Sequence, residues 1–116
     1  MRHMRQEILT QKYVLHIPEY KHENNQTAYI KNIDEIIEKL TRKLEEKSYS
    51  YYIIDAHAQY NGRKYTEKLI NIYSQEKKTI PKIFEEWFKS NNSYLKQESF
   101  AYEENGKLFI ITLKEK

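Results

Sequence analysis

The sequence of 116 residues contains no cysteine, only two glycines and only two prolines. Without cysteine, the chain has no disulfide framework, no thiolate nucleophile and no cysteine-ligated zinc site. Both glycines follow an asparagine, at Asn61-Gly62 and Asn105-Gly106, which is typical of hairpin turns. The glycine-rich loops that bind phosphate or dinucleotides are therefore missing, as are the motifs of serine hydrolases and zinc proteases. These absences predict a protein without a cofactor.

Long apolar runs are also missing. No segment approaches the roughly 20 apolar residues that cross a bilayer, and the basic residues at the start precede no apolar signal sequence. Together with the lack of cysteine, this predicts a protein of the cytoplasm. The length predicts a single domain over residues 1–116, in which about the first eight residues are flexible.

The charge of the chain has little bias towards either sign. The sequence has 20 basic and 17 acidic residues, which give a net charge of +3. Lysine and glutamate alternate through much of the chain, as on solvated surfaces, whereas strong nucleic-acid binders cluster their basic residues on one face. Hydrophobic residues make up 39% of the sequence, which is enough for one small core.

Apolar periodicity divides the chain into strands and helices. Polar and apolar residues alternate over residues 11–17, which predicts a strand, and a polar connection is expected over residues 18–29. Isoleucine and leucine recur at helical spacing over residues 33–47, with Asn32 as the predicted N-cap. A second helix is predicted over residues 79–92, with a proline in its first turn and an asparagine pair at its end.

The two Asn-Gly pairs predict two β-hairpins, because asparagine and glycine tolerate the positive φ of a type I′ turn. The first hairpin covers residues 49–74 and the second covers residues 94–114. Placing the turns at these pairs fixes which residues face each other across each hairpin. The predicted neighbours include Asp55 with Lys68, His57 with Thr66, Gln59 with Lys64, Phe100 with Ile111 and Tyr102 with Phe109.

These elements predict an α+β fold of order β-α-β-β-α-β-β, in which one antiparallel sheet carries both helices on one face. The order resembles the ferredoxin-like pattern with an extra C-terminal strand, and a resemblance in topology alone says little about function. The helices can cover the face of Ile54 and Leu69 or the face of Ile53, Ile70 and Ile72. We favour the second face, buried at the base of the first hairpin and exposed at its tip.

Histidines and carboxylates suggest little metal chemistry. His16 and His22 lie near Glu19 and Glu23 in the sequence, but they lack the short, fixed spacing of a metal-ligand set. We therefore predict surface or hydrogen-bonded histidines and no metal site.

One face of the first hairpin gathers residues of some chemical interest: Asp55, His57, Lys64, Thr66 and Lys68. A histidine beside a carboxylate and a lysine can act as a general base, as in metal-independent ribonucleases. The alternative is a solvated sheet face, on which an Asp55–Lys68 ion pair contributes well under ~1 kcal/mol. Because no nucleophile, second histidine or oxyanion site completes a mechanism, we favour this alternative and predict no catalytic residue.

Tyrosine is the most unusual feature, with 11 residues against 4 phenylalanines and 1 tryptophan. Many tyrosines fall on the first hairpin, where strand alternation directs them to opposite faces. One interpretation is that they are ordinary strand formers. However, both faces cannot pack under the same helices, and exposed tyrosine suits protein interfaces and base stacking. The predicted binding residues are Tyr49, Tyr51, His57, Lys64 and Lys68 on one face, and Tyr52, Tyr60, Arg63 and Tyr65 on the other.

Three functions follow from these features. We place first a small, non-catalytic binding or regulatory protein whose tyrosine-rich sheet face binds a protein partner, as in an inhibitor, an immunity protein or a phage or plasmid regulator. A homodimer through the same sheet is a close variant. The alternative is a single-stranded nucleic-acid-binding module, with Arg63 and Lys64 beside Tyr60 and Tyr65. A metal-independent ribonuclease or toxin that uses His57 comes third, so the chain is predicted not to be an enzyme.

Overall fold

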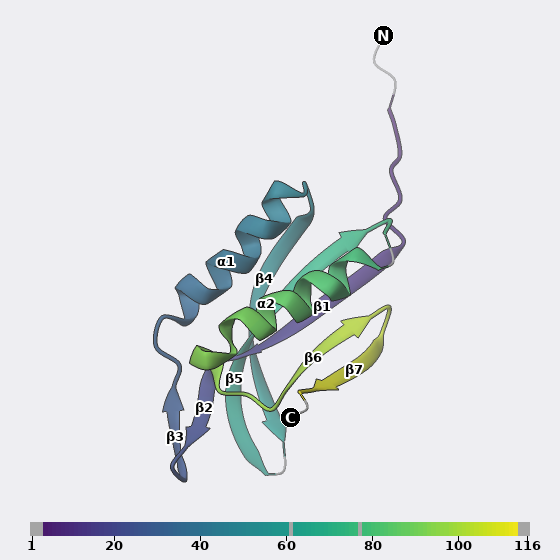
Figure 1. Ribbon diagram of the computed structural model, residues 1–116. Helices are drawn as coiled ribbons and strands as arrows, with labels where there is room; N and C mark the ends of the chain where they lie inside the picture. The colour runs from purple at the N-terminus through teal and green to yellow at the C-terminus, as the bar shows by residue number, and fades with distance from the viewer. Residues whose placement is uncertain (1–3, 61, 77, 114–116) are drawn as a thin grey trace.

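The computed structural model describes residues 4–60, 62–76 and 78–113, and of Glu23 and Tyr60 only the backbone (Figure 1). Among these residues, five strands form one antiparallel sheet of order β4-β5-β1-β6-β7, and a separate hairpin pairs β2 with β3. The elements are β1 (Gln11–Pro18), β2 (Tyr20–Glu23), β3 (Gln26–Tyr29), α1 (Ile33–Glu46), β4 (Ser50–Tyr60), β5 (Arg63–Ser74), α2 (Thr79–Leu95), β6 (Ser99–Glu104) and β7 (Lys107–Thr112).

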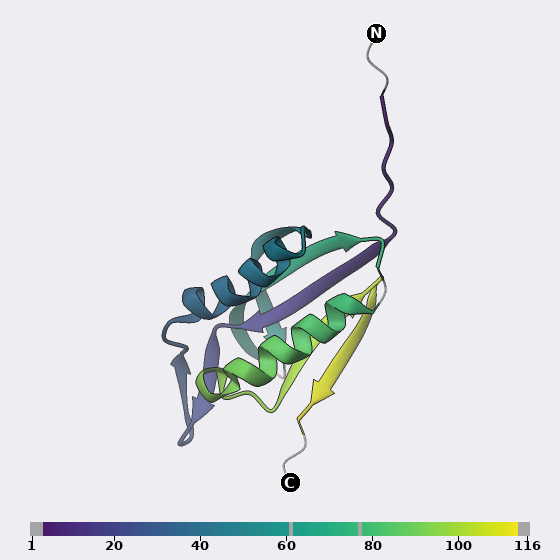
Figure 2. The ribbon, with the colours of Figure 1, turned by 45° about the horizontal axis from the view of Figure 1, so that its top comes forward.

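The predicted α+β fold is confirmed. Both helices lie on one face of the sheet (Figures 1 and 2), and the strands β4, β5, β1 and β6 follow the ferredoxin-like order, with β7 added at the edge. We call the face under the helices the helix-side face and the opposite one the open face. No helix of the described residues is long and apolar enough to span a membrane.

The core lies between the helices and the middle of the sheet. The central strand β1 contributes Tyr13, Leu15 and Ile17, all fully buried. The helices add apolar rows at helical spacing, and the indole N–H of Trp87 donates a hydrogen bond of 2.9 Å to the carbonyl oxygen of Ile36, which ties α2 to α1. The other buried helix residues include Ile33, Ile37, Leu40, Leu44, Ile80, Ile83, Phe84 and Phe88.

Both hairpins have the predicted register, including Asp55 opposite Lys68 and Tyr102 opposite Phe109. The helix-side face of the first hairpin is also the predicted one. At its base Ile70 and Ile72 are fully buried, whereas Ile53 on the edge strand β4 is 42% exposed. Because β4 and β5 are longer than the helices can cover, the outer half of this hairpin extends into solvent (Figure 1).

Three local predictions are wrong in whole or in part. The expected polar connection over residues 18–29 contains the β2–β3 hairpin, which turns at Asn24-Asn25, both with positive φ. Asparagine tolerates this conformation. The residues of β3 are all exposed, so the sequence shows no alternation of apolar and polar residues that would predict this strand. Asn32 is the N-cap of α1, as predicted, and its carbonyl oxygen accepts a hydrogen bond of 3.0 Å from the Ile36 N–H, but its φ is positive and its side chain makes no capping hydrogen bond.

The second helix continues past the asparagine pair to Leu95. Asn91 is buried, and its amide donates a hydrogen bond of 2.8 Å to the carbonyl oxygen of Trp87. The side chain of Asn92 bonds both the backbone N–H and the carbonyl oxygen of Gln97, each at 2.9 Å. The pair therefore stabilises the end of the helix from within instead of stopping it.

The centre of the open face holds a histidine between two carboxylates. His16 on β1 lies with its Nδ1 atom 3.0 Å from Glu67 of β5 and its Nε2 atom 2.7 Å from Glu103 of β6. The hydrogen bond to Glu67 raises the pKa of His16, Glu103 adds to the effect, and burial opposes it. Folding therefore stabilises the protonated imidazolium relative to the unfolded chain.

We predict that this bridge makes stability depend on pH. Because folding raises the pKa of His16, its contribution is fully present below the unfolded value of about 6.5 and is lost as pH rises through the folded value. The free energy of unfolding, measured by urea denaturation across this range, should fall less with rising pH in His16→Gln than in the wild type. His57→Gln, which changes an exposed histidine, should retain the wild-type slope. Equal slopes for wild type and His16→Gln would refute the prediction.

Candidate active site

A cavity of about 410 Å³ lies between α1 and the helix-side face of β4 and β5. Its volume falls in the range of small-molecule sites. We call it the acidic groove. It is lined by Asp34, Ile37, Glu38, Thr41, Tyr51, Ile53, Asp55 and Lys68.

The acidic groove exists because the edge strand β4 extends beyond the packed core. Ile53 and Asp55 continue the helix-side face of β4 outward, and the hairpin register places Lys68 directly opposite Asp55. Asp34 lies in the first turn of α1, where the helix dipole favours a carboxylate. The groove therefore collects charged side chains from three elements.

The ammonium group of Lys68 lies among the carboxylates of the groove. Its Nζ atom lies 2.6 Å from Asp55 Oδ1 and 4.0 Å from Glu19 Oε2. The hydrogen bond to Asp55 raises the pKa of Lys68 most, and the charges of Glu19 and Asp34 raise it further against an opposing effect of burial. The contribution of the Lys68–Asp55 pair to stability is modest, since the Asp55 side chain is largely exposed.

Carboxylates outnumber cations around Lys68. Three carboxylates, Glu19, Asp34 and Asp55, act on its single ammonium group. Glu38 also lines the groove, but it is paired with Arg42 at 2.8 Å on the surface of α1. The groove thus keeps a negative excess, which favours a ligand with positive charge.

Glu19 and Tyr29 lie next to Lys68, although they do not line the groove themselves. Glu19 is buried, and the Tyr29 hydroxyl donates a hydrogen bond of 3.4 Å to Glu19 Oε2. Burial and the charge of Glu19 raise the pKa of Tyr29, so its hydroxyl stays protonated. The ring of Tyr29 also meets that of Tyr20 edge to face, with centroids 5.7 Å apart.

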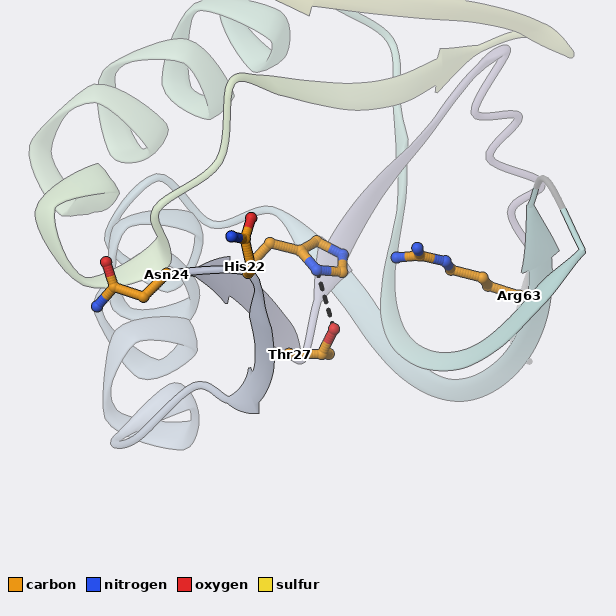
Figure 3. Close-up of a pocket in the computed structure, with 5 residues that line it drawn as sticks. His22, Asn24, Thr27 and Arg63 are labelled. Carbon is orange, nitrogen blue, oxygen red and sulfur yellow. Dashed lines mark hydrogen bonds between the residues drawn. The ribbon is translucent and has the colours of Figure 1, made fainter.

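Two further cavities lie toward the tip of the first hairpin. One, of about 610 Å³, is lined by His57, Lys64 and Tyr65, among others, and by Tyr20 and Thr27 of the β2–β3 hairpin. The other, of about 650 Å³, lies between the β2–β3 turn and Arg63 (Figure 3). There the imidazole of His22 is 2.9 Å from the Thr27 hydroxyl, and the Arg63 side chain extends toward His22.

The structure separates the first predicted set of binding residues. Lys68 lies in the acidic groove, whereas His57 and Lys64 are exposed farther out on the same face. Tyr51 lines the acidic groove together with Lys68, and its hydroxyl donates a hydrogen bond to Glu45. Tyr49 packs against the core and donates a hydrogen bond to Glu76, so it does not line the groove.

The second predicted set lies partly on the open face. Tyr52 is 44% exposed there, and Tyr65 is half-buried nearer the hairpin tip. Arg63 lines the cavity beside His22. The side chain of Tyr60 lies outside the described residues.

Sequence reasoning found only part of the acidic groove and of the residues next to Lys68. The face of Asp55 and Lys68 followed from the Asn-Gly turn, but Glu19, Tyr29 and Asp34 were missed. These three come from the undetected hairpin and from the helix start, and no local pattern marks their convergence. The described residues contain no cluster of three or more side chains placed to hold a metal ion.

No family model and no curated protein matches the sequence. Among solved structures, the chain is similar to a phage SAM lyase in complex with S-methyl-5′-thioadenosine, with a TM-score of 0.55, 13% identity and 97% of each chain covered. The apo state of a phage SAM lyase matches with a TM-score of 0.53 and 13% identity, over 97% of this chain and 99% of that one.

This similarity corrects the predicted function. At 13% identity it shows the shared fold, and both matching structures, which are covered almost completely, are of a phage SAM lyase, which is an enzyme. It contradicts both the prediction of a non-catalytic binding protein, with its nucleic-acid and ribonuclease alternatives, and the prediction that the chain is not an enzyme. The expected phage character agrees with the origin of both matching structures. The chain thus has the fold of a phage SAM lyase.

Proposed function

We propose that the protein is a lyase that cleaves S-adenosylmethionine (SAM), or a closely related sulfonium compound, in the acidic groove. One observation carries the proposal: a chain that matches a SAM lyase over 97% of its length has a groove in which carboxylates outnumber cations. A SAM-cleaving activity also agrees with the cytoplasmic compartment expected from the sequence, because SAM is made and used inside cells.

The charges of SAM complement those of the groove. At neutral pH, SAM carries a positive sulfonium, a positive ammonium and a negative carboxylate. Asp34 and Asp55, which line the groove, suit the two cationic groups, and Lys68 suits the carboxylate. The buried Glu19 adds negative charge beside Lys68, where few water molecules screen it.

The proposed reaction needs neither a metal nor a protein nucleophile. The bond between the sulfonium sulfur and Cγ of the methionine part breaks, and its electron pair moves to sulfur, which leaves as neutral S-methyl-5′-thioadenosine. As this bond breaks, the carboxylate oxygen of the same substrate bonds to Cγ and closes a lactone, or a groove carboxylate accepts a proton from Cβ while a double bond forms. Either route balances without an external reactant. The protein's part is to bind and orient the substrate.

The groove residues should have different effects on the reaction. The sulfonium charge disappears as the bond breaks, so carboxylates near it stabilise the bound substrate at least as much as the transition state, and they mainly improve binding. Lys68 binds the substrate carboxylate in this proposal and so fixes the orientation of the methionine part. Its loss should therefore lower the rate of the chemical step as well as the affinity for the substrate.

The first test is the activity itself. Purified protein incubated with SAM should produce S-methyl-5′-thioadenosine, measured by liquid chromatography and mass spectrometry, faster than the spontaneous breakdown in a heat-denatured control. A rate equal to that of the control, with folded protein confirmed by circular dichroism, would refute the proposal.

The second test concerns Lys68. Lys68→Met should lower kcat/KM on the order of 10- to 100-fold, because it removes a charge-assisted hydrogen bond to the substrate carboxylate. Lys68→Arg should restore part of the loss. The control is Lys89→Met, which removes an ion-paired lysine of α2 that does not line the groove, and it should keep the wild-type rate. If Lys68→Met also kept that rate, the substrate would lie elsewhere.

The third test separates binding from chemistry. Asp34→Asn should raise KM by on the order of fivefold with kcat nearly unchanged, because it removes about 1 kcal/mol of charge attraction to the cationic substrate. The effect should shrink as salt concentration rises. Glu35→Gln changes the neighbouring carboxylate, which does not line the groove, and should leave KM as it is. Equal KM values for the two variants would exclude this role for Asp34.

A further inference from the structure

A cleft lies between the β2–β3 hairpin and the tip of the β4–β5 hairpin. It consists of the two cavities of about 610 and 650 Å³ described above, which share Thr27 as a lining residue. Both volumes fall in the range of small-molecule sites. We call the two cavities together the tip cleft. Its lining includes Tyr20, His22 and Thr27 of the β2–β3 hairpin and Arg63, Lys64 and Tyr65 of β5.

The lining of the tip cleft offers positive charge without negative charge. Its basic side chains are those of His22, His57, Arg63 and Lys64, and none of its described lining residues is an aspartate or a glutamate. The acidic groove has the opposite excess, although both lie along the same hairpin. A cleft lined in this way attracts anions.

Arg63 and His22 face each other in the cavity nearer the turn (Figure 3). Within the described part of the chain, no ion pair joins the exposed Arg63 to a carboxylate. When His22 is protonated, the two cationic groups repel each other. An anion between them removes this repulsion and accepts charge-assisted hydrogen bonds from both.

The ring of His22 is oriented for such a contact. Its Nδ1 atom lies 2.9 Å from the hydroxyl of Thr27, its neighbour across the β2–β3 pair. If the hydroxyl donates to Nδ1, the proton of the neutral ring is on Nε2, and the protonated ring carries protons on both nitrogens. In either form the Nε2–H is available to a ligand. The hairpin is itself fixed to the domain, because the Gln97 amide donates a hydrogen bond of 3.0 Å to the carbonyl oxygen of Tyr20.

The cavity of about 610 Å³ suits the organic part of a ligand. Tyr20 and Tyr65 line it together with Lys64 and Thr66. Tyr20 is 37% exposed, so part of its ring is open to contact. Tyrosine rings pack against planar apolar groups and still offer a polar tip. The tip cleft thus combines an anion-binding end with an aromatic one.

We propose that the tip cleft binds a small phosphate monoester, with its phosphate between Arg63 and His22 and its organic part beside Tyr20 and Tyr65. The planar guanidinium forms two parallel hydrogen bonds to phosphate oxygens. Several converging cationic groups suit a dianion better than a singly charged carboxylate. The inference rests on the tip cleft alone and does not depend on the proposed reaction.

The experiment is an NMR titration of the isotope-labelled protein with phenyl phosphate, which carries no sulfonium and therefore tests the tip cleft apart from the lyase reaction. At low ionic strength the dissociation constant should be on the order of 1 mM. The largest shift changes should occur around His22 and Arg63. Inorganic phosphate, which lacks the ring, should bind at least ~3-fold more weakly. Equal affinity for phenol, which lacks the phosphate, would overturn the proposal.

The variant Arg63→Gln should weaken the binding of phenyl phosphate at least ~10-fold, because it removes a charged donor. The side chain is exposed, so the variant should fold, which circular dichroism can verify. The matched control is Arg42→Gln, which makes the same change on α1 outside the tip cleft and should keep the wild-type affinity. No binding at about 10 mM phenyl phosphate, wild-type affinity in Arg63→Gln, or an equal loss in Arg42→Gln would each overturn the proposal.

Discussion

The central position of β1 is the constraint on which the rest of the structure depends. This strand pairs with β5 on one side and β6 on the other, so it joins two hairpins that are far apart in the sequence. Its side chains alternate between two environments. Tyr13, Leu15 and Ile17 are fully buried beneath the helices, and His16 points to the open face between Glu67 and Glu103. One strand of eight residues thus organises both the core and the centre of the opposite surface.

The local parts of the fold were predictable because short sequence signals determine them. An Asn-Gly pair imposes a turn with positive φ, and this turn sets every neighbour along its hairpin, as Asp55 opposite Lys68 illustrates. The two helices followed from their apolar periodicity. The β2–β3 hairpin was not predictable in the same way. Its turn is Asn24-Asn25, and its two strands pair only with each other. Because β3 is exposed on both faces, its sequence needs no alternation of apolar and polar residues.

The candidate site was less predictable than the fold, because it depends on convergence between distant segments. Asp55 and Lys68 were expected to share a face, but their pairing alone indicates only a surface ion pair. Two further carboxylates turn this ion pair into a site with excess negative charge. Glu19 is buried and lies 4.0 Å from the ammonium group of Lys68, and the charge of Asp34 also acts on that group. Glu19 belongs to the segment between β1 and the unexpected hairpin. A sequence pattern cannot report contacts that exist only once this segment has folded against β5.

The error about enzymatic activity has a chemical explanation. Motif searches look for reactive groups that a protein must contribute, such as an activated serine, a thiolate or a set of metal ligands. The proposed cleavage needs none of these, because the sulfonium is itself the leaving group and the electrons remain within the substrate. A protein can accelerate such a reaction by orientation and electrostatics alone. The residues required are then ordinary lysines and carboxylates, which the sequence contains in large numbers and which only the folded arrangement around Lys68 distinguishes.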